Sequence, residues 1–579
     1  MTSIGEKKTA RIALFLPIRR NFAYSYDPLD EKKLKPGVRV VVPFRNRDEV
    51  GVFTGFEKSD VKTKRIKFVL DEAPVFPKNL VKLAIWCAGY YMCGIGEMFK
   101  IIGPKESIKK RVAYRRGEMN PKRPTAKTSG LIDLLAKPLT AATLSTKAGF
   151  PQKELDKLIK PLVKSGVVVK SEEFYFAATK LDPLTWEEVE LKSLPADVKF
   201  SYTAEQAAAI GKISSEIDKG SGKATLLHGI TGSGKTAVYI ELCRKALKEG
   251  GSAMVLVPEI TLTYQLVRRF YARFGRKIAL MHSGLTPAQR RDEWIRLQKG
   301  DARIVIGARS AVFAPLDDLK LIVVDEEHDG SYKQNENPAY NARDVAVMLG
   351  SFTGAPVVLG SATPSLESFF NAQKGKYSLC ELTHRIDNRP LPPVRCIKES
   401  GDGGDEKRLL PTVVVEEIMA RLGRKEQSLI FINRRGFSAH LKCSVCGVSV
   451  NCPNCSVTLT FHESGGKNII CHYCGYRTGV PKKCPDCGIG RSFRYRGVGT
   501  QKLESFIKEL FPKAAVGRLD HDSAPSRERA FGILEKFEEG KIDILVGTQM
   551  TAKGHDFKNL TFTLIVNADD YLSFPDFRS

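Results

Sequence analysis

The feature that most constrains the fold of this 579-residue chain is a glycine-rich segment between an apolar strand and a helix. The apolar run 224–227 leads into the segment, and the helical segment 237–249 follows it. This context predicts a loop whose backbone N–H groups close around phosphates at a helix N-terminus. The segment consists of Gly229, Ile230, Thr231, Gly232, Ser233, Gly234, Lys235 and Thr236.

Two residues of this loop and an acidic segment further along suit ATP chemistry. We expect the Lys235 ammonium to reach the β- and γ-phosphates of ATP, and the Thr236 hydroxyl to bind Mg²⁺. The acidic segment 325–328 follows the buried strand 319–324, and carboxylates at the carboxyl end of a parallel strand face the ligand crevice. We therefore expect Asp325 to hold Mg²⁺ and Glu326 to orient or activate the attacking water. Lys235, Asp325 and Glu326 are the predicted catalytic residues.

Apolar strands alternate with helical segments from about residue 200 onward, in two successive sets. Such alternation predicts parallel sheets that helices cover on both faces. We expect one sheet within residues 200–385 and a second divided between residues 386–442 and 495–579. The predicted strands are 224–227, 253–257, 303–306, 319–324 and 356–359 in the first set, and 428–432, 514–518, 542–546 and 560–567 in the second.

The segment 443–494 interrupts the second set and contains eight of the 13 cysteines, arranged as four Cys-x-x-Cys pairs. Such pairs present two thiolates to one tetrahedral ion, so four pairs predict two zinc sites with four cysteine ligands each. Spacing allows three ways to combine the pairs, and we favour a nested arrangement. Because every ligand position is then filled, we expect structural sites, with His462 and His472 as less favoured ligands. The predicted sets are Cys443, Cys446, Cys484 and Cys487 for one zinc, and Cys452, Cys455, Cys471 and Cys474 for the other.

The N-terminal part differs in texture from the rest. Residues 1–105 alternate short apolar and β-branched runs with charged turns, which predicts a small β-rich domain. Residues 128–173 predict two helices, and the runs 167–169 and 174–176 predict a terminal hairpin. This pattern is typical of a winged helix spanning residues 106–180, and a plain helical spacer remains the alternative. We assign residues 181–199 to a linker.

The charge of the chain points to a polyanionic partner. Lys plus Arg number 91 against 65 Asp plus Glu, which gives a net charge of +26 and favours nucleic acid. A basic protein without such a partner remains the alternative. No apolar run approaches the ~20 residues of a membrane helix, and the apolar segment 12–18 contains Pro17 and lacks a cleavage site. We expect a cytoplasmic protein with no membrane partner.

With these motifs in one chain, the sequence resembles the primosomal replication-restart helicases of bacteria, a family of helicase superfamily 2. The resemblance extends along essentially the whole chain. It implies a multidomain α/β fold: two RecA-like parallel-sheet lobes, the second incomplete at its C-terminus, with an inserted two-zinc module, an N-terminal β-rich domain and a winged helix. It also implies an ATP-dependent 3′→5′ DNA helicase that recognises stalled or abandoned replication forks and initiates restart by primosome assembly.

The resemblance further implies partners and residue roles. The expected partners are forked and single-stranded DNA, the primosome and replicative helicase-loading proteins, and single-stranded DNA-binding protein. Gln206 is similar to the adenine-contacting glutamine of the family, and segment 360–364 to the motif that couples hydrolysis to strand movement. Segments 431–437 and 547–557 resemble later helicase motifs of the second lobe. The residues implied to contact DNA are Arg309, Tyr332, Lys333, Tyr340 and Arg343.

The sequence departs from the family pattern in two places. Ala23 occupies a position where some members carry an acidic residue that reads the 3′ end of a DNA strand. The chain also stops at Ser579, where the family continues into its last helicase motif, which supplies arginines to the γ-phosphate, and into a C-terminal domain. A fork-binding scaffold that binds ATP and DNA without unwinding is therefore the alternative function. A translocase of a restriction system is disfavoured, because we expect no eight-cysteine insertion there.

Overall fold

The computed structural model describes most of the chain. Two compact units make it up, one formed by residues 1–259 with 270–388, and the other by residues 260–269 with 389–579. None of the described helices is long and apolar enough to cross a membrane. The described residues are 7–568 without 61–62, 105–107, 118, 120–124, 136–138, 177–200, 259–263, 387–389, 391, 398–409, 433–438, 444, 447, 456–457, 463–467, 472–473, 491–492, 497–499, 521–522, 525–526, 549–550, 552–556 and 567.

The first part of the chain folds as an antiparallel sheet with strand order β2-β1-β4-β3-β5. Alternating apolar side chains of these strands, among them Ile12, Val40 and Phe53, are buried and form a small core of their own. The region predicted to be β-rich thus contains a five-stranded antiparallel sheet. Its elements are β1 (Lys7–Leu14), β2 (Phe22–Tyr24), β3 (Arg39–Phe44), β4 (Arg47–Ser59) and β5 (Phe68–Val69).

Two helices that follow this sheet belong to a different core. Helices α1 (Lys78–Tyr90) and α2 (Ile95–Ile102) bury their apolar faces in one continuous cluster with side chains from residues 224–372. Phe76, just before α1, packs edge-on against Trp294 at 6.3 Å between ring centroids. The Gln298 side-chain amide also donates to the Pro74 carbonyl at 2.9 Å. These helices therefore help to complete the core beneath the seven-stranded sheet described below.

A three-stranded antiparallel sheet, ordered β7-β6-β8, and three helices form the next part. Leu131, Leu155 and Ile159 of the predicted helices are buried in its core. The predicted hairpin of 167–169 with 174–176 is wrong, because residues 168–176 form one strand that pairs with β6. The elements are β6 (Ile108–Arg116), α3 (Ala126–Leu134), β7 (Leu139–Thr140), α4 (Ala141–Ala148), α5 (Gln152–Lys164) and β8 (Val168–Phe176).

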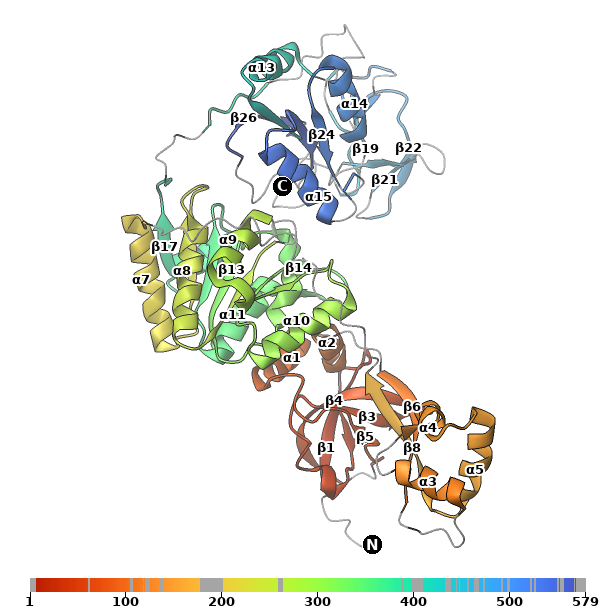
Figure 1. Ribbon diagram of the computed structural model, residues 1–579. Helices are drawn as coiled ribbons and strands as arrows, with labels where there is room; N and C mark the ends of the chain where they lie inside the picture. Colours follow the sequence, from red (N-terminus) through yellow and green to blue (C-terminus); the bar gives the residue numbers. More distant parts are fainter. Residues whose placement is uncertain are drawn as a thin grey trace. The chain divides into compact units, whose positions relative to one another are not determined.

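A seven-stranded sheet, with all neighbouring strands parallel, dominates the first unit (Figure 1). Its order is β11-β12-β10-β13-β16-β9-β17, and its central strands are buried on both faces. The strands are β9 (Ala224–Gly229), β10 (Ser252–Leu256), β11 (Ile278–Met281), β12 (Ile304–Gly307), β13 (Leu319–Asp325), β16 (Val357–Ser361) and β17 (Ser378–Leu382).

Helices and a small ribbon accompany this sheet. Five predicted strands are present, and the sequence patterns missed β11, which is short, and β17, which is only partly buried. The elements are α7 (Ala204–Lys219), α8 (Lys235–Lys248), α10 (Pro287–Lys299), α11 (Ala342–Thr353), α12 (Leu366–Gln373), and the ribbon of β14 (Lys333–Gln334) and β15 (Tyr340–Asn341). Helix α9 (Tyr264–Phe274) is divided between the units, with residues 264–269 in the second and 270–274 in the first.

The second unit contains a four-stranded parallel sheet, ordered β24-β25-β18-β26, with the cysteine-rich module inserted between β18 and β24. The module is a five-stranded antiparallel sheet, ordered β22-β21-β20-β19-β23. The parallel strands are β18 (Gln427–Ile432), β24 (Val516–Leu519), β25 (Ile544–Gly547) and β26 (Leu560–Val566), with helices α13 (Thr412–Gly423), α14 (Thr500–Leu510) and α15 (Arg527–Glu538). The module strands are β19 (Ala439–Cys443), β20 (Thr460–His462), β21 (Asn468–Ile470), β22 (Arg477–Gly479) and β23 (Phe493–Arg496).

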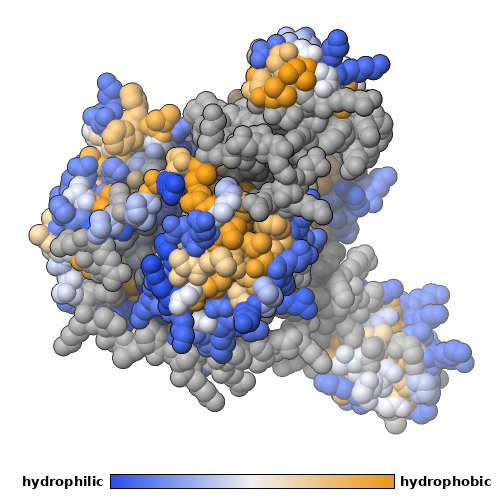
Figure 2. Space-filling model, turned by 90° about the horizontal axis from the view of Figure 1, so that it is seen from above, coloured by the Kyte–Doolittle hydropathy of each residue, from blue (hydrophilic) through white to orange (hydrophobic). Residues whose placement is uncertain are grey.

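On the face shown in Figure 2, hydrophilic residues surround several apolar areas. This fits the composition of the chain, in which 27% of the residues are charged. Large apolar side chains are the exception on such a surface. They include Leu366 and Phe370 on α12, Tyr90 at the end of α1, Met92 just after it, and Val445 beside a cysteine cluster.

Candidate nucleotide and metal-binding sites

The glycine-rich loop joins β9 to α8, as its sequence context predicts. Gly232 and Gly234 have φ angles of 85° and 80°, a region that glycine adopts without strain. The turn therefore requires glycine at both positions. The Ser233 side chain is buried beneath the loop. The Lys235 ammonium donates to the Gly229 carbonyl at 2.7 Å, which folds the lysine across the loop. A phosphate oxygen is the partner that this ammonium would exchange for that carbonyl.

Asp325 ends β13 at the same edge of the sheet as the glycine-rich loop. Its Oδ1 accepts a hydrogen bond from the Tyr239 hydroxyl at 2.9 Å, and the Tyr332 hydroxyl donates to its main-chain carbonyl at 2.6 Å. Burial, helped by the neighbouring charge of Glu326, raises the pKa of Asp325 to about 6, against the lowering effects of Lys235 and the Tyr239 bond. A carboxylate in this setting gains from a nearby cation, as a Mg²⁺ ligand does.

Tyr239 is a site residue that the sequence patterns missed. It lies one helical turn after Lys235 on α8, and it is completely buried. The signal in the sequence was an aromatic residue four positions after the phosphate-loop lysine. That signal identifies no partner, because Asp325 is 86 residues away along the chain.

Glu326 follows Asp325 in an unusual backbone conformation. Its φ angle is 46°, in the left-handed region that non-glycine residues rarely adopt, and such strain concentrates at functional sites. His328 lies beside it, with Nδ1 3.6 Å from Glu326 Oε2 and 2.8 Å from the Ser361 hydroxyl. The bond to Ser361 connects the acidic segment to the end of β16, where segment 360–364 begins.

Glu327 is the most deeply buried carboxylate of the acidic segment, and it binds the start of α12. Its two oxygens accept from the Ser365 N–H at 2.6 Å and from the Ser368 hydroxyl at 2.8 Å. The Arg343 guanidinium lies 3.2 Å from Glu327 Oε2 and also contacts Asp344 at 3.0 Å. Arg343 therefore joins the acidic segment to the residues that follow segment 360–364.

Gln206 lies against the glycine-rich loop. Its side-chain N–H donates to the Ser233 carbonyl at 2.8 Å, and its side-chain oxygen accepts from the Thr203 N–H at 3.0 Å, which caps α7. The neighbouring Glu205 accepts from the Thr383 N–H at 2.8 Å, after β17. The hydrogen bonds from Thr383 and His384 lower the pKa of Glu205 to about 2. A role for Gln206 in adenine contact stays a prediction.

The residues predicted to contact DNA differ in exposure. Tyr332 and Tyr340 are 1% and 3% exposed, and Tyr340 packs edge-on against Phe313, so neither ring offers a face for stacking in this conformation. Arg309 is held by the main-chain carbonyl of Lys333 at 3.0 Å. Lys333 itself is exposed. DNA contact by this group stays a prediction, and it would require the two tyrosines to leave the core.

The cysteines of the second unit gather into two clusters, each holding its ligand atoms within 4.8 Å of one another. One cluster joins the outer pairs, with Cys443 Sγ 3.7 Å from Cys487 Sγ and Cys446 Sγ 3.6 Å from Cys484 Sγ. The inner pairs form the other, with Cys452 Sγ 3.6 Å from Cys474 Sγ. The grouping is the nested one. The complete sets are Cys443, Cys446, Cys484 and Cys487, and Cys452, Cys455, Cys471 and Cys474.

These distances suit a tetrahedral ion. Four thiolates about 2.3 Å from one zinc lie about 3.8 Å from each other, whereas a disulfide joins sulfurs about 2.05 Å apart. The clusters therefore fit Zn²⁺ and are not disulfides. A role for His462 or His472 as a ligand stays the less favoured prediction, because each cluster already holds four cysteines.

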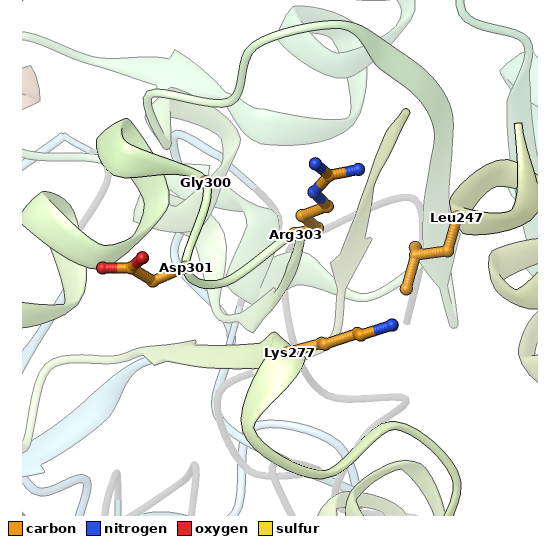
Figure 3. Close-up of a pocket in the computed structure, with 5 residues that line it drawn as sticks. All are labelled: Leu247, Lys277, Gly300, Asp301 and Arg303. Atoms are coloured by element: carbon orange, nitrogen blue, oxygen red, sulfur yellow. The ribbon is translucent and has the colours of Figure 1, made fainter. Parts of the chain in front are cut away.

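A hollow in the first unit lies away from this chemistry (Figure 3). Lys277 and Arg303 line it, directly before β11 and β12, together with Leu247, Gly300 and Asp301. It is thus at the amino edge of the parallel strands, whereas the glycine-rich loop and Asp325 lie at the carboxyl edge. Ligands of parallel sheets bind at the carboxyl edge, so this hollow is not the nucleotide site.

Several predicted motifs of the second lobe fall on residues outside the described part of the chain. They are residues 433–437 of segment 431–437, and residues 549–550 and 552–556 of segment 547–557. The predicted linker 181–199 also lies outside the described residues. Their predicted roles stay predictions.

A phosphate-type loop and a carboxylate segment at one edge of a parallel sheet, followed by a second parallel sheet, define a two-lobed nucleotide-dependent helicase. Family profiles agree: residues 203–370 match "DEAD/DEAH box helicase", residues 11–104 match "3'DNA-binding domain (3'BD)", and residues 452–478 match "PriA DNA helicase Cys-rich region (CRR) domain". The chain belongs to the family of the replication restart protein PriA, whose members are DNA helicases.

Relatives and solved structures give the extent of this similarity. The chain is 35% identical to the replication restart protein PriA of Haemophilus influenzae over 99% of its length and 78% of that protein. It is 42% identical to the Bacillus subtilis protein of the same name over 73% of its length, and the match spans 51% of the relative. A structure of RecG bound to a three-way DNA junction shares 17% identity with a TM-score of 0.34, covering 63% of this chain and 38% of that one.

Proposed function

We propose that this chain is an ATP-dependent DNA helicase that moves 3′→5′, recognises stalled or abandoned replication forks and starts replication restart by primosome assembly. The strongest support is that Lys235 and Asp325 lie at one edge of a parallel sheet, close enough for the lysine charge to lower the pKa of the carboxyl. The same chain carries the 3′ DNA-binding profile at residues 11–104. A cytoplasmic location accompanies this role.

ATP would bind with its phosphates along the glycine-rich loop. The backbone N–H groups of the loop would hold the β-phosphate, and Lys235 would exchange the Gly229 carbonyl for phosphate oxygens. Thr236 and Asp325 offer oxygen ligands for Mg²⁺, which would neutralise charge on the transferring phosphate. Glu326 would orient or deprotonate the attacking water.

Two zinc ions would complete the cysteine-rich module. Each cluster offers four thiols at the spacing of a closed tetrahedral site, and no ligand position is left for a substrate. The ions would therefore hold the knuckles of the antiparallel sheet together, because that sheet encloses only a few buried apolar residues, such as Leu459 and Ile469.

Forked and single-stranded DNA would be the substrates. The net charge of +26 supports binding to phosphate backbones, and Lys333 is an exposed cation beside the acidic segment. The proposed protein partners are the primosome and replicative helicase-loading proteins and single-stranded DNA-binding protein. They follow from the family role.

ATP hydrolysis by the 579-residue chain, with and without forked DNA at low salt, tests this function. We expect DNA-stimulated turnover, which Lys235→Ala should abolish while fork binding stays intact. Lys248→Ala, at the exposed far end of the same helix, is the matched control and should keep full turnover. Fork and ATP binding without any turnover would contradict the helicase and favour a fork-binding scaffold.

A further inference from the structure

The hydrogen bond between Tyr239 and Asp325 joins two parts of the nucleotide site that are separate in sequence. The tyrosine lies on α8, the helix that begins at Lys235, and the aspartate ends β13. Its hydroxyl donates to Oδ1 at 2.9 Å, and the whole side chain is 0% exposed. The burial of the tyrosine shields this bond from bulk solvent.

The neighbouring strand confines the tyrosine ring. Asp325 is paired with Gly360 in the register of β13 and β16. A Cβ atom on Gly360 would lie 1.7 Å from the Tyr239 hydroxyl oxygen and 2.8 Å from the ring carbon that bears it. The ring thus occupies the space that any side chain at position 360 would fill, and glycine at this position is a condition for the bond.

The chemistry of the pair fixes its direction. A phenol hydroxyl carries a proton and an ionised carboxylate carries none, so Tyr239 donates and Asp325 accepts. This donor comes from α8 and restrains the Asp325 carboxylate at the end of β13, while the remaining lone pairs of the carboxylate stay available for a cation.

We propose that Tyr239 is a positioning residue that orients the Asp325 carboxylate to receive Mg²⁺ with the bound nucleotide. Partners of this kind, which bond to a metal ligand rather than to the metal, typically contribute 10–100-fold to metal affinity. The inference rests on the proposed function, because it takes Asp325 as the Mg²⁺ ligand.

The test is a Mg²⁺ titration of the full chain with a fluorescent ADP analogue, without DNA and without turnover. Tyr239→Phe removes only the hydroxyl, and we expect the Mg²⁺ concentration at half-saturation to rise about 10-fold. Affinity for the analogue without Mg²⁺ should stay within about twofold, which also shows that the variant is folded. The control is Tyr202→Phe, whose hydroxyl bonds to Glu241, a carboxylate elsewhere on α8, at 3.1 Å. It should leave the Mg²⁺ midpoint unchanged.

The outcomes separate the two levels of the proposal. A wild-type chain whose nucleotide affinity ignores Mg²⁺ contradicts the proposed ATP site itself. A normal wild-type response with an unchanged midpoint in Tyr239→Phe overturns the positioning role, and so does an equal shift in Tyr202→Phe. Loss of nucleotide binding without Mg²⁺ in Tyr239→Phe would mean that the tyrosine supports the loop rather than the metal ligand.

A second variant keeps the idea testable if Tyr239→Phe is unstable. Gly360→Ala should displace the hydroxyl and raise the Mg²⁺ midpoint by a similar factor. In the Tyr239→Phe background it should add less than about twofold, because the same bond is already gone. Full additivity of the two changes would overturn the coupling between Gly360 and Tyr239.

Discussion

Arg343 and Glu327 form a buried ion pair, with 3.2 Å between Nη1 and Oε2 and side chains 14% and 0% exposed. The pair joins α11 to the acidic segment that follows β13. The same guanidinium donates to the Ser365 hydroxyl at 2.8 Å, which caps α12. The Arg343 guanidinium thus contacts Glu327, Asp344 and Ser365. A DNA contact, its predicted role, would compete with these three contacts.

Replacing Arg343 with Met should lower the free energy of unfolding by about 3 kcal/mol, because it leaves the buried Glu327 charge without its cation. Urea unfolding measures the change. The double variant Arg343→Met with Glu327→Gln should recover part of the loss, since no charge then remains unpaired. A variant with unchanged stability and weakened fork binding would instead favour a direct DNA contact.

Tyr91 should anchor the N-terminal helices to the helicase lobe. Its hydroxyl accepts from the Asn341 N–H at 3.1 Å and donates to the Asn341 carbonyl at 3.4 Å, just before α11. Tyr91→Phe leaves both main-chain groups without this partner and should cost about 1–3 kcal/mol of unfolding free energy. Tyr90→Phe is the control, because Tyr90 is 61% exposed. Equal effects in thermal unfolding of the two variants would argue against the anchor.

Glu293 should make the stability of the first unit depend on pH. Burial raises its pKa from 4.5 to about 7, against the lowering effect of Arg296, so the folded state holds a proton that the unfolded state releases. This contribution is complete below about pH 4.5 and is lost as the pH rises through about 7. Over that window it amounts to about 3 kcal/mol.

The check is chemical unfolding at pH 5 and pH 8 for the wild type and Glu293→Gln. The glutamine cannot ionise, so its loss of stability between the two pH values should be smaller by about that amount. Parallel pH profiles for the two proteins would show that Glu293 ionises normally in the fold.

Removing one ligand from each cysteine cluster should remove one zinc ion at a time. The wild type should carry about two zinc ions by elemental analysis, and Cys446→Ser and Cys455→Ser should each carry about one. The double variant should carry none. Loss of both ions from a single substitution would mean that the two clusters fold as one unit, and full retention would exclude these thiols as ligands.

Fork binding should weaken steeply with salt, because contacts to phosphates release counterions. Between 50 and 200 mM salt, we expect the affinity to fall at least about 10-fold. Fluorescence anisotropy with a labelled fork measures this. Equal affinity at both concentrations would mean that the +26 net charge plays no part in binding.

Local patterns were enough to predict the phosphate loop. Gly232 and Gly234 adopt positive φ angles, which glycine accommodates without strain, so the residue type itself indicates the turn. The strand before the loop and the helix after it are recognisable from the periodicity of their apolar residues. The cysteine clusters were predictable for a similar reason, since each knuckle is a local unit and only their pairing is long-range. The five predicted strands of the first sheet are apolar runs, and β17 was missed because it is only partly buried. The four-residue β11 was missed although it is as long as the predicted β12.

The partners of Asp325 were beyond the reach of sequence patterns. The bond from Tyr239 depends on how α8 rotates over β13, and the space for it depends on Gly360 of a neighbouring strand. The burial of Tyr332 and Tyr340 could not be predicted either, because a loop sequence does not reveal which side faces the core. Their contact with DNA stays a prediction.

A fragment that began at residue 200 would keep every strand of the seven-stranded sheet and still be incomplete. Without residues 76–102, Trp294 would lose its ring contact with Phe76, and the shared core would lose the buried side chains of α1 and α2, such as Leu83. The first hundred residues and the ATP-binding lobe are therefore not independent folding units that evolution could exchange separately. A substitution at Phe76 would alter the core of the ATP-binding lobe as well as the region that follows the N-terminal sheet.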